Sequence, residues 1–208
     1  EDIISHNINT VLSMVQDPDR LIPHAKTHKS KEILKLQIDH GIKRHKTSTL
    51  EEIEVLAECS PEELILAYPI TSKIKADRYS KIIKKFSNVK FSSIIGSVYH
   101  LEIASQIEEL DGVYIDLDTG MHRTGINLEE SDELLDKLFN SSEIKFKGIH
   151  GYDGHLVGLT DIEEKQEIVN KSIDIVEEFR NKISKFSQDQ NYDIIVGGSW
   201  SFQYYLNK

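Results

Sequence analysis

The stretch Pro23-His24-Ala25-Lys26-Thr27-His28-Lys29 follows the short apolar run Leu21-Ile22 and brings two lysines and two histidines into six residues. It lies where a strand is expected to end and a helix to begin. In barrel-type α/β proteins, that end of the strands carries the active site. A partly desolvated lysine beside other cationic groups attacks carbonyl carbons as an amine nucleophile. The stretch therefore points to such a lysine, with a solvated basic turn as the alternative.

Short apolar runs alternate with longer amphipathic stretches along the rest of the chain. Apolar residues in helical spacing predict helices over 3–15 and 162–186. Thr49, with Glu52 three residues later, forms a capping box that predicts a helix over Leu50–Ala57. Strands that alternate with helices indicate βαβ units and a parallel sheet. Seven strands are predicted, over 21–25, 42–46, 64–67, 89–95, 113–117, 144–149 and 194–196.

This pattern predicts a (β/α)8 barrel of the TIM type that is incomplete at its C-terminus. A closed barrel has eight strands, and the seventh predicted strand is followed only by a helix start over 199–205. With 208 residues and no linker or repeat, the chain is expected to be one partial domain over 1–208. The last strand of the barrel is expected to be absent.

The composition restricts the class of protein. A net charge of −10 argues against a nucleic-acid binder. No apolar run approaches the roughly 18 residues that cross a bilayer, and the single cysteine excludes an intramolecular disulfide. We therefore expect a cytoplasmic protein without a membrane partner. The segment from Arg20 to Lys46, however, contains eight Lys and Arg residues and only two acidic residues. This local excess of positive charge fits an anionic small molecule as the ligand.

Four segments lie at the expected carboxyl ends of strands, over 24–29, 116–125, 150–155 and 197–201. Because loops at that end of a parallel barrel meet at one mouth, these distant segments are expected to be neighbours. Gly197-Gly198-Ser199 has the composition of a phosphate site, since glycines allow a close backbone approach and helix N-termini favour anions. An ordinary Gly-Gly turn is the alternative.

Four motifs carry a resemblance to a known family: 23–29, Asp118-Thr119-Gly120-Met121-His122-Arg123-Thr124-Gly125, Gly151-Tyr152-Asp153-Gly154-His155 and Gly197-Gly198-Ser199. They resemble the D-threonine aldolase and D-serine dehydratase group of the alanine-racemase-like, fold-type III enzymes, which use pyridoxal phosphate. Segments 41–49 and 66–69 also resemble that group. The similarity runs in order from about Asn7 to Phe202. The Lys-Thr-His-Lys and Arg-Thr-Gly motifs are its more specific parts.

The resemblance implies roles for individual residues. Lys26 is the lysine that holds pyridoxal phosphate as a Schiff base, with Lys29 as the rival. Arg123 lies beside the cofactor ring, unless it forms a surface pair with Asp118 or Asp116. Both Lys26 and Arg123 are thus implied to be catalytic and to bind the cofactor.

Tyr152 is the residue that packs against the ring, and the resemblance makes it catalytic as well. His155 contacts the cofactor or the substrate. For both, a side chain satisfied in the core is the alternative. The resemblance also implies that His24, Gly197, Gly198 and Ser199 bind the cofactor, the last three through its phosphate. His24 and His28 are further implied to support the site indirectly.

The chemistry implied is a lyase reaction on a D-3-hydroxy amino acid, with retro-aldol cleavage to glycine and an aldehyde. Dehydration, racemisation and non-catalytic carriage of the cofactor are the alternatives. The family places a divalent metal with ligands from a C-terminal β-domain, which this sequence lacks, so no residue here is nominated as a metal ligand. Related enzymes are often dimers, so a homodimer is expected.

Two further features of the sequence have other interpretations. Asp118-Thr119-Gly120 matches the aspartic-protease triplet, but that mechanism needs two carboxylates in a β-rich fold, and there is one copy here. The histidine-rich segment 24–28 offers no cage of further ligands for a metal. An inactive barrel that keeps the family motifs as scaffold is a further alternative.

Overall fold

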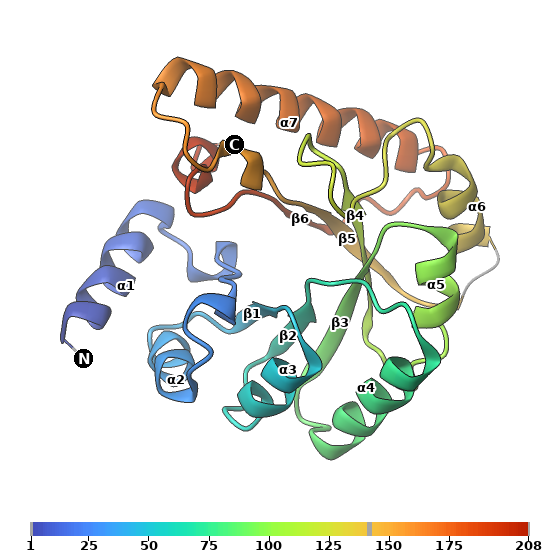
Figure 1. Cartoon of the computed structure of the whole chain (residues 1–208), viewed down its shortest axis with the longest axis horizontal. Helices are drawn as coiled ribbons and strands as arrows, with labels where there is room; N and C mark the ends of the chain where they lie inside the picture. The colour runs from blue at the N-terminus through green and yellow to red at the C-terminus, as the bar shows by residue number, and fades with distance from the viewer. Residues whose placement is uncertain (1, 141–142, 208) are drawn as a thin grey trace. The chain divides into compact units, whose positions relative to one another are not determined.

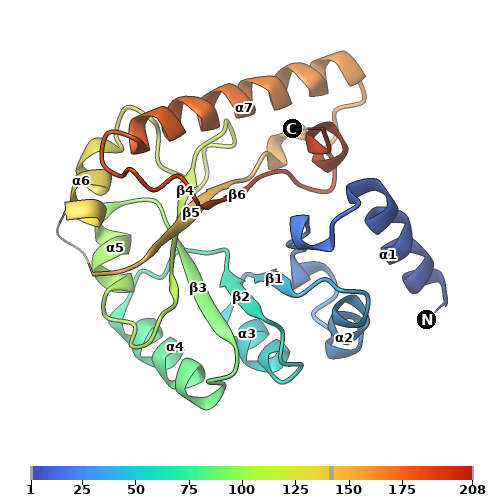
Figure 2. The ribbon, with the colours of Figure 1, turned by 180° about the vertical axis from the view of Figure 1, so that it is seen from behind.

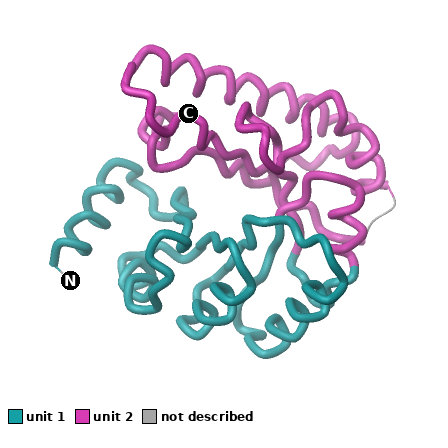
Figure 3. The backbone as a smooth tube through the Cα atoms, viewed as in Figure 1, with its two compact units in different colours: residues 1–93, 106–111 teal, residues 94–105, 112–208 magenta. Residues whose placement is uncertain are grey.

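The computed structural model describes residues 2–140 and 143–207 (Figure 1). Its contacts divide the chain into two compact units, shown in Figure 3. Unit 1 contains Glu1–Ser93 and Gln106–Asp111, and unit 2 contains Ile94–Ser105 and Gly112–Lys208. Both units alternate strands with helices, as βαβ units do.

Unit 1 contains the parallel strands β1 (Arg44–Thr47) and β2 (Glu63–Leu66), and β2 pairs in turn with β3 (Lys90–Ile95). The register places Arg44 beside Glu63 and Glu63 beside Lys90. The helical elements are α1 (Asp2–Val15), η1 (Pro18–Arg20), η2 (Ala25–Thr27), α2 (Lys31–Asp39), α3 (Leu50–Ala57) and α4 (Lys73–Lys85), of which η1 and η2 are short 3-10 turns.

Helices α3 and α4 are held on the strands of unit 1 by their apolar faces (Figure 1 and, from behind, Figure 2). Ile53 and Leu56 of α3 are fully buried. Tyr79 of α4 packs edge-on against Phe91 of β3, with ring centroids 6.0 Å apart, and its hydroxyl donates to the Ser92 carbonyl at 3.0 Å. Burial of one such side chain contributes roughly 1.5–3 kcal/mol. These contacts fix the strands of unit 1, and the lysine-rich turn is bridged to the first of them at Lys46.

Unit 2 contains the parallel strands β4 (Gly112–Leu117), β5 (Phe146–Gly151) and β6 (Asp193–Ile195). Gly148 of β5 has φ +152°, and a Cβ there would lie 2.1 Å from the Asp193 carbonyl oxygen. Only glycine therefore lets β5 and β6 approach so closely. The helical elements are α5 (Val98–Ala104), α6 (Asp132–Asn140), η3 (Gly154–Leu156), α7 (Ile162–Ile183) and η4 (Phe202–Tyr205).

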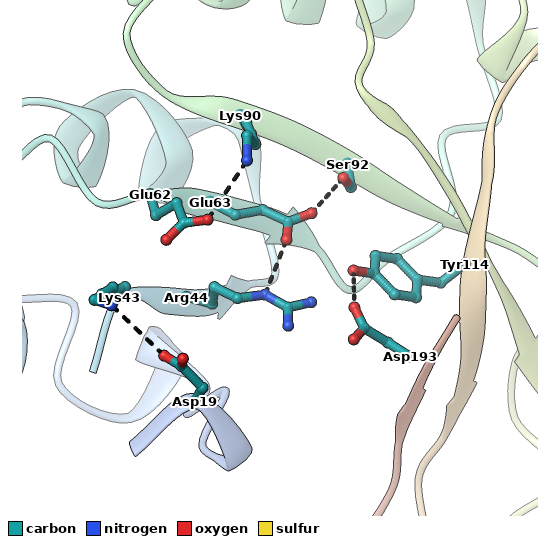
Figure 4. Close-up of polar contacts among 9 residues, drawn as sticks. All are labelled: Asp19, Lys43, Arg44, Glu62, Glu63, Lys90, Ser92, Tyr114 and Asp193. Atoms are coloured by element: carbon teal, nitrogen blue, oxygen red, sulfur yellow. Dashed lines mark hydrogen bonds and ion pairs between the residues drawn. The ribbon is translucent and has the colours of Figure 1, made fainter. Parts of the chain in front are cut away.

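The amino ends of the strands hold buried polar pairs (Figure 4). In unit 1, Arg44 Nε donates to Glu63 Oε2 at 3.1 Å, and the Ser92 hydroxyl donates to the other Glu63 oxygen. In unit 2, the Tyr114 hydroxyl donates to Asp193 Oδ2 at 2.9 Å. Charges at this end of a barrel serve stability, because chemistry occurs at the opposite end.

The predicted elements are largely confirmed. Six of the seven predicted strands overlap β1 to β6, and the helices predicted over 3–15, 50–57 and 162–186 are α1, α3 and α7. The strand predicted over 21–25 is wrong, because that segment forms a single parallel bridge from His24 to Lys46. The Pro23 carbonyl accepts from the Lys46 N–H at 2.9 Å, but Pro23 has no N–H to continue a ladder.

The helix predicted to start over 199–205 also differs. The segment forms only η4, a 3-10 helix of four residues that begins at Phe202. The Ser201 hydroxyl accepts from the Gly198 N–H at 2.9 Å, and the N–H groups of Ser201 and Phe202 donate to the Gly198 carbonyl at 3.1 and 2.9 Å. These bonds close a tight turn, so Gly197-Gly198-Ser199 does not precede an α-helix.

Candidate functional site

Lys26 lies on the short turn η2, at the end of the bridge between His24 and Lys46, and its side chain is exposed. The His24 ring caps this turn, because its Nδ1 accepts the Lys26 N–H at 3.2 Å. The His24 Nε2 lies 3.2 Å from Ser48 Oγ, in the loop after β1. His24 thus holds the backbone that carries Lys26, and its predicted contact with a cofactor stays a prediction.

Lys29, the rival lysine, is engaged elsewhere. Its Nζ lies 3.1 Å from Glu52 Oε1, and the Glu52 side chain is 5% exposed. The second Glu52 oxygen accepts the Ser48 N–H at 2.8 Å. Lys29 also has φ +50°, a conformation that side chains other than glycine adopt at a cost. The Lys29 ammonium is therefore paired with the carboxylate of a buried glutamate.

Two histidines near this turn have lowered pKa values. Burial, with a smaller contribution from the charge of His28, lowers the pKa of His45 to about 4. Neither ring nitrogen of His45 has a hydrogen-bond partner among the described residues. Burial likewise lowers the pKa of His28, although a backbone hydrogen bond with Ser30 and the charge of Glu52 oppose the shift. The Ser30 N–H donates to His28 Nδ1 at 3.1 Å, so His28 supports the turn rather than facing solvent.

Unit 2 brings three of the four predicted segments together around the Tyr152 ring. The Arg123 guanidinium lies over this ring, with Cζ 5.1 Å from the centroid. Both residues line a hollow at the carboxyl ends of β4 and β5, together with Asp116, Leu117 and Asp118. A Cβ at Gly198 would lie 3.0 Å from Tyr152 Cε2 at the edge of the same ring. The ring thus touches all three segments.

Asp116 and Asp118, the alternative partners for Arg123, form hydrogen bonds with other groups. Asp118 accepts the N–H groups of Gly120 and His122 at 2.9 Å each, and its Oδ2 lies 2.7 Å from His122 Nδ1. Burial favours the neutral form of Asp118, but these bonds outweigh it and its pKa is lowered. Within the described ranges, Arg123 forms no ion pair with Asp116 or Asp118. A cation stacked on an aromatic face contributes roughly 0.5–2 kcal/mol.

The Gly197-Gly198-Ser199 turn offers a partial anion site. Gly197 has φ +87°, and the Gly198 N–H already donates to Ser201. The N–H groups of Ser199 and Trp200 have no protein partner in the part of the chain that is described. Two adjacent backbone N–H groups can donate to a phosphate oxygen, but the turn precedes only a short 3-10 helix and so no α-helix dipole adds to them.

His155 lies apart from this turn. Its ring packs against Gly120, whose added Cβ would lie 3.3 Å from the imidazole. His155 Nδ1 is buried and has no partner within residues 2–140 and 143–207. The neighbouring Asp153 is also buried, and its Oδ2 accepts from the Tyr205 hydroxyl at 3.1 Å. These contacts do not place His155 at the Tyr152 ring.

The strand ends also hold a buried polar group that the motifs did not indicate. Asp116 Oδ1 lies 2.6 Å from His150 Nδ1, and the Thr124 hydroxyl donates to Asp116 Oδ2 at 2.7 Å. The side chains of Asp116 and His150 are about equally buried, at 6% and 5% exposure. Asp116 and His150 are neighbours in the β4–β5 register, and this register is the signal that could have revealed the pair.

The described residues contain neither a metal-binding cluster nor a membrane-spanning helix. No group of three or more His, Cys, Asp or Glu side chains there is arranged to hold a metal ion. None of the described helices has the length and apolar character needed to cross a membrane.

Comparison with solved structures finds the same fold in longer proteins. D-threonine aldolase from Filomicrobium marinum has a TM-score of 0.86 and 16% identity over 99% of this chain and 57% of its own. D-threo-3-hydroxyaspartate dehydratase from Delftia sp. HT23 has a TM-score of 0.81 and 18% identity over 96% and 54%. Alanine racemase from Corynebacterium glutamicum has a TM-score of 0.66 and 18% identity over 89% and 51%. The chain thus spans about half the length of these proteins.

No curated protein sequence matches the chain. The family model described as the N-terminal domain of alanine racemase, by contrast, matches residues 1–192, which is most of the chain. The match covers the lysine-rich turn of unit 1 and the strands that carry Asp116 and Tyr152 in unit 2. On this evidence, the chain belongs to the alanine racemase N-terminal domain family, an α/β fold of the TIM-barrel type.

Proposed function

We propose that this chain is the cofactor-binding part of a pyridoxal-phosphate-dependent lyase that cleaves D-3-hydroxy amino acids to glycine and an aldehyde. The observation that carries the proposal is the meeting of segments 118–125, 151–155 and 197–199 at the Tyr152 ring. The likeness of the fold to D-threonine aldolase supports the choice of reaction.

The residues present fit pyridoxal phosphate by their chemistry. Lys26 supplies an exposed amine for the aldehyde. The Tyr152 ring and the Arg123 guanidinium supply an aromatic face and a cation for a planar anionic ring. The N–H groups of Ser199 and Trp200 supply donors for the phosphate. We do not assign the Gly198 N–H to the phosphate, because Ser201 already accepts it.

When bound, pyridoxal phosphate supplies an electron sink for negative charge at the α-carbon of an amino acid. Lys26 would hold the cofactor through its side-chain amine. In the cleavage, the bond between the α- and β-carbons breaks, a base takes the β-hydroxyl proton and the α-carbon gains a proton. We assign the delivery of that last proton to the Lys26 side chain in its ammonium form. No further reactant is consumed.

A divalent metal beside the β-hydroxyl is part of the proposal for the whole protein, and we assign none of its ligands to this chain. The substrate is a small D-amino acid, and a homodimer is the proposed assembly. A dehydratase is the second candidate, since the dehydratase from Delftia sp. HT23 has a TM-score of 0.81 with this chain. In that reaction, the α-proton and then the β-hydroxyl leave the substrate.

The test is a product assay with pyridoxal phosphate, a divalent metal and one of D-threonine, D-serine or D-alanine. Glycine and acetaldehyde from D-threonine are expected, and Lys26→Ala should abolish their formation. Pyruvate from D-serine as the main product would replace the aldolase by a dehydratase, and L-alanine from D-alanine would indicate a racemase. Bound cofactor with no product from any substrate would overturn the lyase in favour of a carrier.

A further inference from the structure

We propose that Tyr205 is a positioning residue that holds the Gly197-Gly198-Ser199 turn in the shape that binds an anion. Its ring packs on the turn, and its hydroxyl anchors the ring to Asp153, in the segment after β5. The inference rests on the proposed function only for the identity of the anion as the phosphate of the cofactor. All residues of this clamp belong to unit 2.

The ring of Tyr205 covers the first residue of the turn. A Cβ added at Gly197 would lie 3.1 and 3.2 Å from Cδ2 and Cε2 of Tyr205, so one edge of the ring is in close contact with the Gly197 backbone. Gly197 has φ +87°, a conformation that glycine adopts without strain. The backbone at this left-handed position is thus packed against the Tyr205 ring, and the placement of the ring bears on the shape of the turn.

The Tyr205 hydroxyl in turn fixes the ring. It donates to Asp153 Oδ2 at 3.1 Å, and Asp153 is 3% exposed. Burial, the charge of Asp153 and the hydrogen bond with it raise the pKa of Tyr205, while a hydrogen bond with Ser172 of α7 opposes the shift. The phenol therefore keeps its proton at neutral pH and remains a donor to the carboxylate.

The Asp153 carboxylate depends on this bond. Its other oxygen, Oδ1, is buried and has no hydrogen-bond partner in the described parts of the chain. That oxygen would lie 3.5 Å from a Cβ added at Gly198, so the carboxylate lies beside the turn as well as beside the Tyr205 hydroxyl. A buried carboxylate is costly to leave without a donor. We therefore expect Tyr205 and Asp153 to hold each other, and the turn, in one arrangement.

The clamp bears on anion binding through the backbone of the turn. The N–H groups of Ser199 and Trp200 bind one anion together only when the turn directs both to the same place. A carboxylate beside the turn repels an anion by its charge. Any favourable contribution of Asp153 must therefore come from its position, so loss of its charge and loss of its hydrogen bond should have opposite effects.

A titration with inorganic phosphate, at constant ionic strength and without cofactor, tests the clamp. Trp200 is the single tryptophan of the chain and lies on the turn, so its fluorescence reports binding. Tyr205→Phe keeps the ring but loses the hydroxyl, and it should weaken phosphate binding at least about fivefold. Tyr204→Phe, on the same 3-10 helix but outside the clamp, is the control and should bind as the wild type does.

Two variants of Asp153 separate position from charge. Asp153→Ala should weaken phosphate binding at least about fivefold, although it removes a negative charge near the anion. Asp153→Asn keeps an acceptor for the phenol and should bind phosphate at least as tightly as the wild type. The double variant Asp153→Ala/Tyr205→Phe should bind no more weakly than either single variant, because both changes remove the same hydrogen bond.

Two results would overturn the clamp. The first is equal phosphate affinity in the wild type and Tyr205→Phe, even if Tyr205→Phe is less stable to urea, because Tyr205 would then serve stability alone. The second is tighter binding in both Asp153→Ala and Asp153→Asn, because Asp153 would then act by its charge. Far-ultraviolet circular dichroism checks that each variant is folded, and Tyr205→Phe decides the matter if Asp153→Ala is not.

These outcomes are distinct from those of the proposed function. No binding of phosphate to the wild type, by fluorescence or by equilibrium dialysis, would overturn the inference, while the product assay with D-threonine would still decide the lyase. The expected order of phosphate affinities without glycine from D-threonine would support the clamp and contradict the lyase.

Discussion

The Asp116 carboxylate and the His150 imidazole form a buried pair, with Oδ1 2.6 Å from Nδ1, at the carboxyl ends of two neighbouring strands. The Thr124 hydroxyl satisfies the other carboxylate oxygen. Removal of one partner from a buried charged pair leaves the other without compensation. The pair therefore ties segment 118–125, which carries Arg123, to the strand that precedes Tyr152.

Asp116→Ala is expected to lower the free energy of unfolding by about 3 kcal/mol, because His150 and Thr124 both lose a buried acceptor. Urea denaturation followed by circular dichroism measures the loss. Asp136→Asn, on the exposed side of α6, is the matched control and should change the value by less than about 0.5 kcal/mol. Equal losses in the two variants would refute the role given to the buried pair.

Glu63 and Glu62 provide a second contrast between neighbouring carboxylates (Figure 4). Glu63 is 3% exposed and bonds Arg44 and Ser92, so Glu63→Ala should cost about 3 kcal/mol of stability. Glu62 forms an exposed pair with Lys90 at 3.4 Å, and Glu62→Ala should cost less than about 1 kcal/mol. Thermal unfolding compares them, and a larger loss for Glu62→Ala would be inconsistent with this assignment.

His45 makes the stability of unit 1 depend on pH. Because its pKa is about 4 in the fold and 6.5 as a free side chain, the unfolded chain binds a proton that the fold excludes between those values. The free energy of unfolding should therefore fall as pH is lowered from about 6.5 toward 4, by up to about 3 kcal/mol from this group.

His45→Leu tests this account of acid sensitivity. Leucine has a similar volume and no unpaired nitrogen, so the variant should be as stable as the wild type or more stable at pH 7.5. Its stability should also change less between pH 6.5 and pH 4.5, as measured by urea denaturation at each pH. His28 still titrates, so some dependence should remain. The same slope in both proteins would show that His45 is not the acid-sensitive group.

Gly154 controls the position of the Tyr152 ring. A Cβ at Gly154 would lie 2.4 Å from Tyr152 Cε1, so Gly154→Ala should displace the ring from Arg123 and weaken binding of pyridoxal phosphate at least about tenfold. Equilibrium dialysis measures the affinity. Gly158→Ala is the control, since no atom lies within 4 Å of its added Cβ, although its φ of +90° costs about 1 kcal/mol of stability. Unchanged affinity in Gly154→Ala would exclude the Tyr152 ring from the cofactor site.

Apolar periodicity was sufficient to predict most of the fold. It located α1, α3 and α7 because each buries one apolar face, and it located β2 to β6 because each contains a short apolar run. It failed at 21–25, where the residues are apolar but Pro23 cannot donate and the Lys26 N–H turns to His24. The apolar content of a segment indicates that it is buried, whereas a β-ladder also requires backbone N–H groups that are available to donate.

The parts of the site that lie within single sequence motifs could be predicted from the sequence. Segments 118–125, 151–155 and 197–199 follow successive strands of unit 2, so topology alone brought them to the Tyr152 ring. Asp116 and His150 were missed because their contact depends on the strand register, which one sequence does not give. The contact of Glu52 with the Ser48 N–H was missed because Glu52 has the spacing of an ordinary capping box.

The most direct test of the central claim is the visible absorbance spectrum of the protein with pyridoxal phosphate. The band of a lysine-bound cofactor should appear in the wild type, persist in Lys29→Ala and be absent in Lys26→Ala. A band that survives in Lys26→Ala and is lost in Lys29→Ala would contradict the assignment of Lys26 as the cofactor-bonding residue.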